Sequence, residues 1–192
     1  MKAREFVIVV ALLAASAHTC VEAQTRGRRR AAAPAPKSVV GIEAIDFENY
    51  TYPLNGQTYK LVGGYYARGT APAPQWELRL AEPTYYGDLT GDGKNEAVVV
   101  LSHGAVGGPQ TVEARVYTLR EGRAALLATF PLADALSCEL DHYVDLDEGK
   151  VRIEQLVGRA GRCDHNEIKE FRWDGTAFKA IGETRTMPCR CM

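Results

Sequence analysis

Five residues of one short loop have the chemistry to hold a cation. The stretch GDLTGDGKNE covers residues 87–96, and alternate positions of it can supply oxygen atoms: Asp88, Thr90, Asp92, Lys94 (through its carbonyl) and Glu96. Calcium takes several hard oxygen ligands from carboxylates, carbonyls and water. Gly93 lies at the sixth position, where the chain must reverse sharply. The loop therefore predicts a Ca²⁺ site, whose role we expect to be structural.

A metal-free turn is the alternative for this loop. Asp and Gly are ordinary turn residues, and Asp88 is able to cap the turn by accepting backbone N–H bonds. However, three carboxylates lie within nine residues, and they repel one another unless a cation or solvent relieves them. The residues that follow, 97–101, are all apolar and predict a central strand covered on both faces.

Four cysteines follow the N-terminal region and form an even set: Cys138, Cys163, Cys189 and Cys191. In an exported chain, an even number predicts disulfides, here with three possible connectivities. A bridge between Cys189 and Cys191 would close a small, strained ring. We therefore expect two bridges in the C-terminal half, either Cys138 with Cys163 or each with one cysteine of the C-terminal pair.

Two further chemistries are conceivable. Cys138 with His142 and Cys163 with His165 offer thiolate and imidazole ligands for zinc, but their spacings do not follow the usual paired pattern. A hydrolase would need an Asp or Glu with His103 or His142, and the chain has no nucleophile elbow of the G-x-S-x-G type. We expect a domain that is not an enzyme, with an envelope hydrolase as the alternative.

Aromatic residues are concentrated in the first half of the predicted domain, with seven tyrosines between positions 50 and 86 and Trp76. Exposed on a sheet, such rings would form a platform for sugars or peptides. On strands they also fill cores or stack across them. The adjacent pair Tyr65-Tyr66 places one ring on each face, so we expect some of these rings to reach solvent.

The N-terminus has the layout of an exported protein. Residues 1–23 combine a basic start, an apolar run and a small-residue cleavage site, which predicts a signal peptide. The apolar run is too short for a transmembrane span. Lipid attachment at Cys20 is the alternative. Residues 24–38 are rich in Arg, Ala and Pro and predict a flexible linker. We expect a periplasmic or extracellular location.

The remainder, residues 39–192, has the length of one domain. Residues 1–37 hold seven of the 23 basic and two of the 24 acidic side chains, which leaves 16 basic and 22 acidic ones. The body therefore has a formal net charge near −6. An acidic body excludes nucleic acid as the expected partner.

Short alternating segments separated by turn residues indicate a mainly β fold built from successive antiparallel hairpins. Turns are expected at Asn55-Gly56, at 120–122, at 147–149 and at Asp174-Gly175, where Asp-Gly favours a type I′ turn. Residues 39–52 alternate like a strand, and residues 131–137 (PLADALS) predict the one short helix. An α+β fold is the alternative.

The loop resembles the calcium loop of the FG-GAP and related secreted β-repeat families, whose pattern runs D-x-N-G-D-G-x-x-D before an apolar strand. Asp88, Gly91, Asp92 and Gly93 match it, whereas Thr90 and Glu96 depart from it. The chain has a single copy, so the propeller of those families does not carry over. The body, with DFENYTYP and FRWDGTAF, is similar to uncharacterised exported bacterial proteins, which implies export and no particular activity.

These features together predict an exported, non-enzymatic β domain that is stabilised by calcium and disulfides. We expect it to bind a polymer or a protein at the cell envelope. An inhibitor-like module that presents a disulfide-held loop at residues 158–166 is a further alternative.

Overall fold

The computed structural model describes residues 41–69, 75–159 and 161–190. The contacts separate Met1–Lys37 from Ser38–Met192, and every described residue belongs to the second unit. The predicted signal peptide (1–23), the linker (24–38), Cys20 and Cys191 lie outside the described residues. Those assignments stay predictions.

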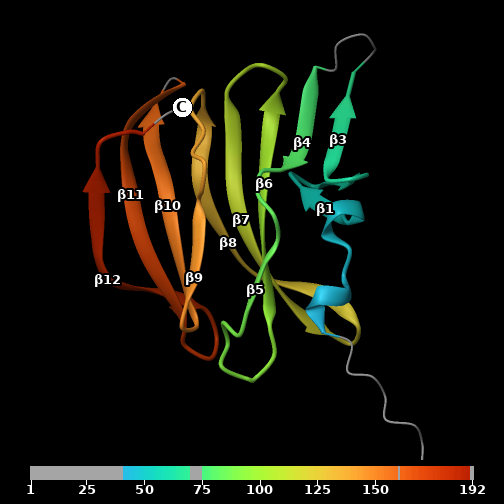
Figure 1. Ribbon diagram of the computed structural model, residues 1–192. Coiled ribbons are helices and arrows are strands. Elements are labelled where there is room, and N and C mark those ends of the chain that lie inside the picture. The colour runs from blue at the N-terminus through green and yellow to red at the C-terminus, as the bar shows by residue number, and fades with distance from the viewer. Residues whose placement is uncertain (1–40, 70–74, 160, 191–192) are drawn as a thin grey trace, which may run out of the picture. The chain divides into compact units, whose positions relative to one another are not determined.

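The structure has three antiparallel sheets, and the largest of them has six strands (Figure 1). Five of them follow the order β3 (Tyr65–Arg68), β4 (Trp76–Leu80), β6 (Glu96–Ala105), β7 (Gln110–Arg120) and β8 (Arg123–Leu136). The sixth, β5 (Tyr85–Gly87), pairs with the first residues of β6. Strands β4 and β5 therefore follow one another along the same edge of β6, joined by a corner at residues 81–84.

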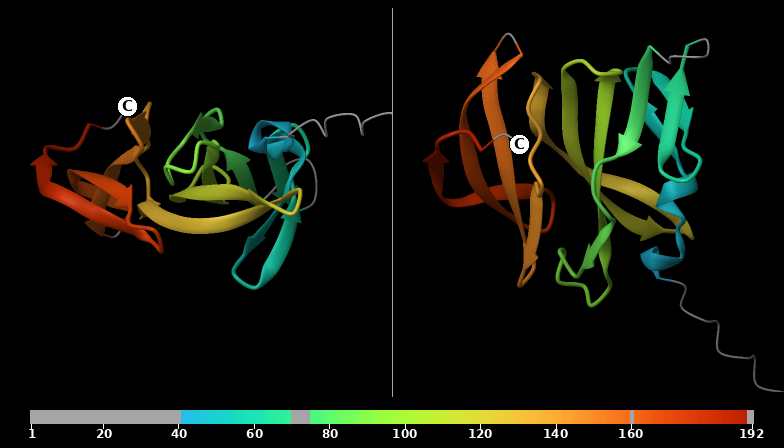
Figure 2. Two further views of the ribbon diagram at one scale, coloured as in Figure 1. Left: turned by 90° about the horizontal axis from the view of Figure 1, so that it is seen from below. Right: turned by 45° about the horizontal axis from the view of Figure 1, so that its top comes forward.

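A second sheet has four strands in the order β12 (Phe178–Met187), β11 (Arg162–Trp173), β10 (Lys150–Arg159) and β9 (Val144–Asp147). A third consists of the hairpin β1 (Thr51–Leu54) and β2 (Gln57–Lys60). The prediction of a mainly β fold of antiparallel hairpins is confirmed. Strand β8 bends away from the six-stranded sheet, so that it contacts β10 of the four-stranded one (Figures 1 and 2).

Three hairpins turn through two-residue loops in which both residues have positive φ. The loops are Asn55-Gly56, Glu121-Gly122 and Glu148-Gly149, with φ between 45° and 76°. This is the type I′ geometry that matches the twist of the strands it joins. Glycine at the second position adopts the left-handed conformation without steric cost, which explains why the sequence signal was reliable.

Two cores lie on opposite faces of the central strand β6. Val98 and Val100 face the core shared with the four-stranded sheet. Ala97, Val99 and Leu101 face the second core, beneath the β1–β2 hairpin. All five side chains are fully buried. This confirms the prediction of a central strand covered on both faces.

Residues 131–137 do not form the predicted helix, because residues 131–136 are the end of β8. The helical spacing of Leu132, Ala133 and Leu136 has another cause. The pairing of β8 with β7 shifts register at Val112, and Ala135 has a φ of 50°. Such bulges break the strand's period of two, so the buried positions follow a helix-like spacing.

The start of the domain differs as well. Residues 39–52 do not form one strand: two single 3₁₀ turns, η1 (Ile42–Ala44) and η2 (Phe47–Asn49), precede β1. The side chain of Asp46 accepts a bond from the amide of Asn49 at 3.1 Å and stabilises η2. None of the helices in the described ranges has the length and hydropathy of a membrane span.

The turn at Asp174-Gly175 is also not the predicted type I′ turn. Trp173 pairs with Phe178, which leaves a four-residue loop. The Asp174 carboxylate accepts bonds from the amides of Thr176 and Ala177, each at 2.8 Å. This side-chain cap stabilises the longer loop, and the same bonds lower the pKa of Asp174 to about 2.

Candidate functional site

The acidic loop at residues 88–96 bonds to its own backbone. The Asp88 carboxylate accepts from the amides of Gly91 at 2.7 Å and Gly93 at 3.0 Å. The Asp92 carboxylate accepts from the amide of Lys94 at 2.9 Å. Such short-range bonds stabilise a tight turn without a metal ion. They also leave acceptor capacity on each carboxylate, since an ionised carboxylate offers about four lone-pair sites.

Glu96 is buried beneath this loop, with 1 % of its surface exposed. Its carboxylate accepts from the amides of Leu89 and Thr90, each at 3.0 Å. The hydroxyls of Thr90 (3.4 Å) and Thr118 (3.1 Å) donate to its other oxygen, so the carboxylate accepts four hydrogen bonds. Burial raises the pKa of Glu96, and the bonds from Leu89, Thr90 and Thr118 oppose that rise.

The five predicted calcium ligands are therefore placed unequally. Asp88, Asp92, Thr90 and the Lys94 backbone lie on the partly exposed or exposed side of the loop, whereas Glu96 points inward. A cation at Glu96 would have to displace one of its four bonds. Within the described ranges, no three His, Cys, Asp or Glu side chains group closely enough to hold a metal. Calcium binding stays a prediction.

One disulfide in the structure limits the possible pairings of the cysteines. Cys163 and Cys189 are bonded to each other across 26 residues, with their Cα atoms 6.1 Å apart. This excludes a Cys138–Cys163 bridge and a Cys189–Cys191 bridge. Cys138 is disulfide-bonded too. A sulfur in a disulfide is not a thiolate, so the zinc alternative loses the ligands that Cys138 and Cys163 would supply.

The two histidines that were considered for a hydrolase lie on opposite faces of the six-stranded sheet. His103 is on β6 with the residues of the second core, and its ring centroid lies 6.0 Å from that of Trp76. Burial lowers the pKa of His103. His142 lies near Tyr85 on the other side. The two imidazoles therefore cannot serve one site.

His142 instead belongs to a cluster with Glu82 and Tyr85. The Tyr85 hydroxyl donates to Glu82 Oε2 at 2.9 Å and lies 3.2 Å from His142 Nδ1. The second carboxylate oxygen of Glu82 accepts from the amide of Tyr143 and lies 3.9 Å from His142 Nδ1. The Glu82 side chain is 5 % exposed and that of His142 is 55 % exposed. A buried carboxylate thus fixes an aromatic hydroxyl beside an accessible imidazole.

The surroundings of Tyr85 keep its hydroxyl group protonated. Burial raises the pKa of Tyr85 to about 12, with the hydrogen bond to Glu82 and its negative charge as further causes. The phenol therefore stays protonated at any physiological pH. Because its proton is donated to Glu82, its oxygen is left to accept a bond from His142 or from a ligand.

A small hollow of about 90 Å³ opens beside His142. Its lining comes from two segments: His142, Tyr143, Val144 and Asp145, which lead into and begin β9, then Arg152 and Glu154 of β10. Asp145 and Arg152 are directly opposite on β9 and β10 and approach to 3.8 Å. The hollow therefore presents hydrogen-bond donors and acceptors side by side.

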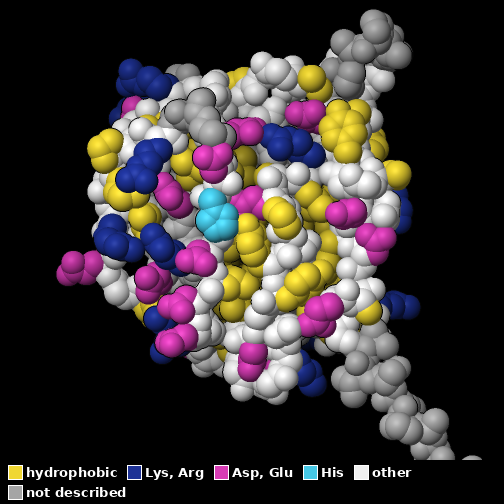
Figure 3. All heavy atoms as spheres, in the orientation of Figure 1, with side chains coloured by type: hydrophobic (Ala, Val, Ile, Leu, Met, Phe, Trp, Pro, Cys, Tyr) yellow, Lys and Arg dark blue, Asp and Glu magenta, His cyan; other side chains and the backbone are white. Residues whose placement is uncertain are grey.

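The surface around the hollow combines apolar and charged side chains. Apolar side chains gather around β5, and acidic and basic side chains mix over the four-stranded sheet (Figure 3). Asp145 and Arg152 both have partly accessible side chains, 56 % and 42 % exposed. A ligand that offers both apolar and hydroxyl surface would fit this face.

A larger hollow, of about 330 Å³, lies beside residues 93–95 of the acidic loop. It is lined by backbone at Gly41 and Gly93 and by the apolar residues Ile42 and Leu119. Its polar side chains Glu43 and Asn95 bond to each other at 2.5 Å. Lys94 and Thr118 also line it, and the Thr118 hydroxyl donates to the buried Glu96. We place the candidate site at His142, where the lining includes an imidazole and the Asp145–Arg152 pair.

Most of the tyrosines considered for an aromatic platform fill the second core. Tyr52 and Tyr59 are buried there, and Tyr50, Tyr66 and Trp76 pack against them. The T-shaped contacts between these rings are of the kind that stabilise cores. Tyr65 and Tyr86 are exposed, as expected for part of the set.

Sequence reasoning named His142 but missed Glu82, Asp145, Arg152 and Glu154 as partners in one place. The only local signal for Glu82 was a charged residue just after an alternating strand, in the stretch LAEP. Arg152 and Glu154 alternate with buried residues in β10, as any solvated strand face would. No family model, curated protein or solved structure matches this chain.

Proposed function

We propose that this chain is an exported, non-enzymatic domain that binds a hydroxyl-rich polymer at the cell envelope through the hollow at His142. The observation that carries the proposal is the convergence of Glu82, Tyr85 and His142 with the Asp145–Arg152 pair. These groups come from three separate segments of the chain.

The size of the hollow favours a polymer over a small molecule. Pockets that enclose a drug-sized ligand measure roughly 300–1,000 Å³, and this one measures about 90 Å³. A chain that lies across the surface needs to insert only one polar group. Its other residues are free to contact the face around β5.

The chemistry of the hollow favours hydroxyl groups. A hydroxyl donates one hydrogen bond and accepts others, so it is able to pair with Arg152 and Asp145 at once. The body of the protein has a net charge near −6. An anionic polymer would be repelled by that charge, so we favour a neutral polysaccharide.

The hydrolase alternative is less well supported than binding. Both oxygens of Glu82 are already engaged, one by Tyr85 and one by the amide of Tyr143. A carboxylate held in this way orients its neighbours more readily than it transfers protons. The inhibitor alternative rests on residues 158–166, whose described part lies at the β10–β11 end and includes the disulfide-bonded Cys163.

Calcium and disulfides are proposed to stabilise the domain without contacting the polymer. The acidic loop and its bonds are separate from the residues that line the hollow at His142. We therefore expect calcium to affect the melting temperature and not the affinity.

The test is a pull-down of the exported chain with insoluble neutral polysaccharides, namely chitin and cellulose. We expect retention of the wild type by at least one of them, and about tenfold weaker retention of His142→Ala and Arg152→Ala. His165→Ala is the matched control, because His165 bonds to Glu167 away from the hollow.

Two results would contradict the proposal. Equal retention of His142→Ala, Arg152→Ala and the wild type would show that the hollow is not the binding site. Release of new reducing sugar ends during the incubation would show an enzyme.

A further inference from the structure

One wall of the hollow is held in place by a buried side chain of β11. Glu154 lines the hollow, and its Oε1 accepts a hydrogen bond from Asn166 Nδ2 at 2.7 Å. Asn166 is fully buried, with 0 % of its surface exposed. A buried amide needs a partner, and a bond from it restricts the carboxylate that accepts it.

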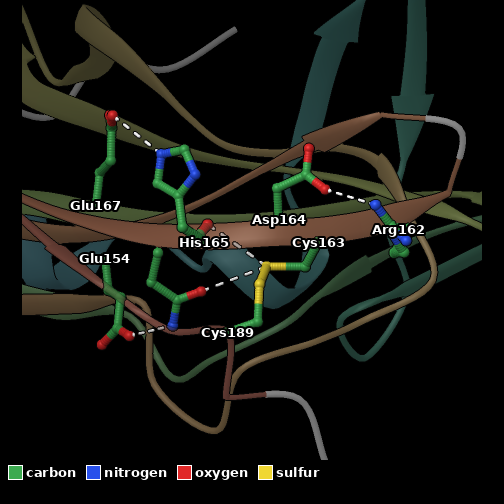
Figure 4. The surroundings of a disulfide bond; sticks show 8 residues. Glu154, Arg162, Cys163, Asp164, His165, Glu167 and Cys189 are labelled. Atoms are coloured by element: carbon green, nitrogen blue, oxygen red, sulfur yellow. Dashed lines mark hydrogen bonds and ion pairs between the residues drawn. A yellow bond between two sulfur atoms is a disulfide. The ribbon is translucent and has the colours of Figure 1, made fainter.

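The Cys163–Cys189 disulfide packs against the same asparagine. Cys163 Sγ lies 3.5 Å from Asn166 Oδ1, a contact without a hydrogen bond because a disulfide sulfur carries no proton. In Figure 4, Glu154 and the disulfide lie on one side of β11, and the ring of His165 and Glu167 lie on the other. A continuous chain of contacts thus joins the disulfide to the hollow.

The disulfide also holds the end of the neighbouring strand. Met187, the last residue of β12, pairs with Asn166, and Cys189 follows two residues later. Opening the bond would release residues 188–190 from β11. Water would then reach the Asn166 amide and compete with Glu154 for its N–H bond.

We propose that Asn166 and the Cys163–Cys189 disulfide position Glu154 for contact with the polymer, so that reduction of this disulfide weakens binding. The inference rests on the proposed function, because it concerns the same hollow. Asn166 is a positioning residue here, since it touches Glu154 and not the ligand.

The redox step needs a dithiol as reductant. One thiolate of the dithiol attacks a sulfur of the disulfide, and its second thiolate closes a new disulfide within the reductant. Two electrons and two protons pass to the protein, which leaves Cys163 and Cys189 as thiols. Dithiothreitol serves as the probe for this class of reductant.

The first experiment separates positioning from folding. Asn166→Asp places a carboxylate against Glu154, and we expect about tenfold weaker polymer retention. Asn166→Leu removes the donor to Glu154 without adding a charge, so we expect it to weaken retention as well. Asn95→Asp is the matched control, because Asn95 makes the same kind of bond to Glu43 far from the hollow.

The second experiment tests the disulfide with and without polymer. We expect the double variant Cys163→Ser/Cys189→Ser, and the wild type in dithiothreitol, to bind several-fold more weakly than the oxidised wild type. Without polymer, the ¹³C signal of the Glu154 carboxyl should shift in Asn166→Asp and in the double serine variant. This signal reports on Glu154 directly, and a loss of stability alone would not move it.

The outcomes distinguish the two proposals. A wild type that binds no polymer overturns the proposed function, and the Glu154 signal then decides alone whether Asn166 positions that carboxylate. A wild type that binds, with unchanged retention and an unchanged Glu154 signal in Asn166→Asp, overturns the further inference and leaves the proposed function standing.

Discussion

The acidic loop at residues 88–96 and the hollow at His142 use the same kinds of side chain for different ends. In the loop, Asp88, Asp92 and Glu96 bond to amides no more than seven residues away. At the hollow, the lining polar groups come from residues 142–145 and 152–154, and Glu82 and Tyr85 contact His142 from a third segment. The loop uses its polar groups to stabilise itself, whereas the hollow leaves them partly accessible.

The difference separates stability from binding. Glu96 is buried with four bonds, so its removal should affect folding. His142 is more than half exposed, so its removal should affect a ligand and leave the fold intact.

The largest effect is expected for Glu96→Ala. This change leaves the amides of Leu89 and Thr90 buried or half-buried without their acceptor. Each unsatisfied buried donor costs on the order of 1–3 kcal/mol, so we expect a loss of about 3 kcal/mol in the free energy of unfolding. Urea titration checks this, with the exposed Glu48→Ala as control. A loss no larger than that of the control would contradict our account of the loop.

Glu96→Gln tests whether the hydrogen bonds at this position matter more than the negative charge. The amide oxygen is able to accept from Leu89 and Thr90, while its NH₂ donates to the hydroxyls of Thr90 and Thr118. The pKa of Glu96 is raised in the fold, so its ionisation reduces stability as the pH rises from the unfolded value through the folded one. We expect Glu96→Gln to stay within about 1 kcal/mol of the wild type and to lack this pH-dependent decline.

A smaller effect is expected for Asp88→Asn, because one of its two acceptor oxygens remains. An amide NH₂ would then face the N–H of Gly91 or Gly93. We expect a loss of about 1 kcal/mol, measured by urea titration in EGTA.

The same variant tests the calcium prediction. Excess calcium should raise the melting temperature of the wild type above its value in EGTA, and should raise that of Asp88→Asn less. If calcium leaves the wild-type melting temperature unchanged, the calcium prediction is wrong and the loop is a metal-free turn.

The effect that is absent at neutral pH is that of Tyr85, which contributes to the pH dependence of stability only at high pH. Its pKa is raised to about 12, so its contribution is complete below pH 10 and is lost as the pH rises to 12. The difference in absorbance at 295 nm between the wild type and Tyr85→Phe isolates the ionisation of Tyr85, and we expect its midpoint near pH 12. In Glu82→Gln, the midpoint should move towards 10, because the hydrogen bond to a charged acceptor is lost. A midpoint of 10 in the wild type would contradict the cluster.

The sequence was informative for several local features. Type I′ turns need positive φ at two adjacent residues, so Asn55-Gly56 and Glu148-Gly149 could be located from their residue types. The apolar run at 97–101 likewise indicated a strand with two buried faces. The helix expected at 131–137 was wrong because register shifts between β7 and β8 changed the spacing of the apolar residues.

The candidate site was largely hidden for a physical reason. Glu82 joins the candidate site only where the corner between β4 and β5 meets Tyr143, and that contact joins residues 61 positions apart. Arg152 and Glu154 look like any solvated residues of β10 until the fold brings Asp145 to Arg152 and Asn166 to Glu154. Periodicity within a segment carries no information about which segments meet.

The most direct test of the central claim is an NMR titration of the chain with a soluble oligomer of the polysaccharide retained in the pull-down. We expect chemical-shift changes at residues 82–85, 142–145 and 152–154, including the His142 imidazole, with residues 88–96 unchanged. Shifts at residues 88–96 that leave His142 unmoved would contradict the central claim.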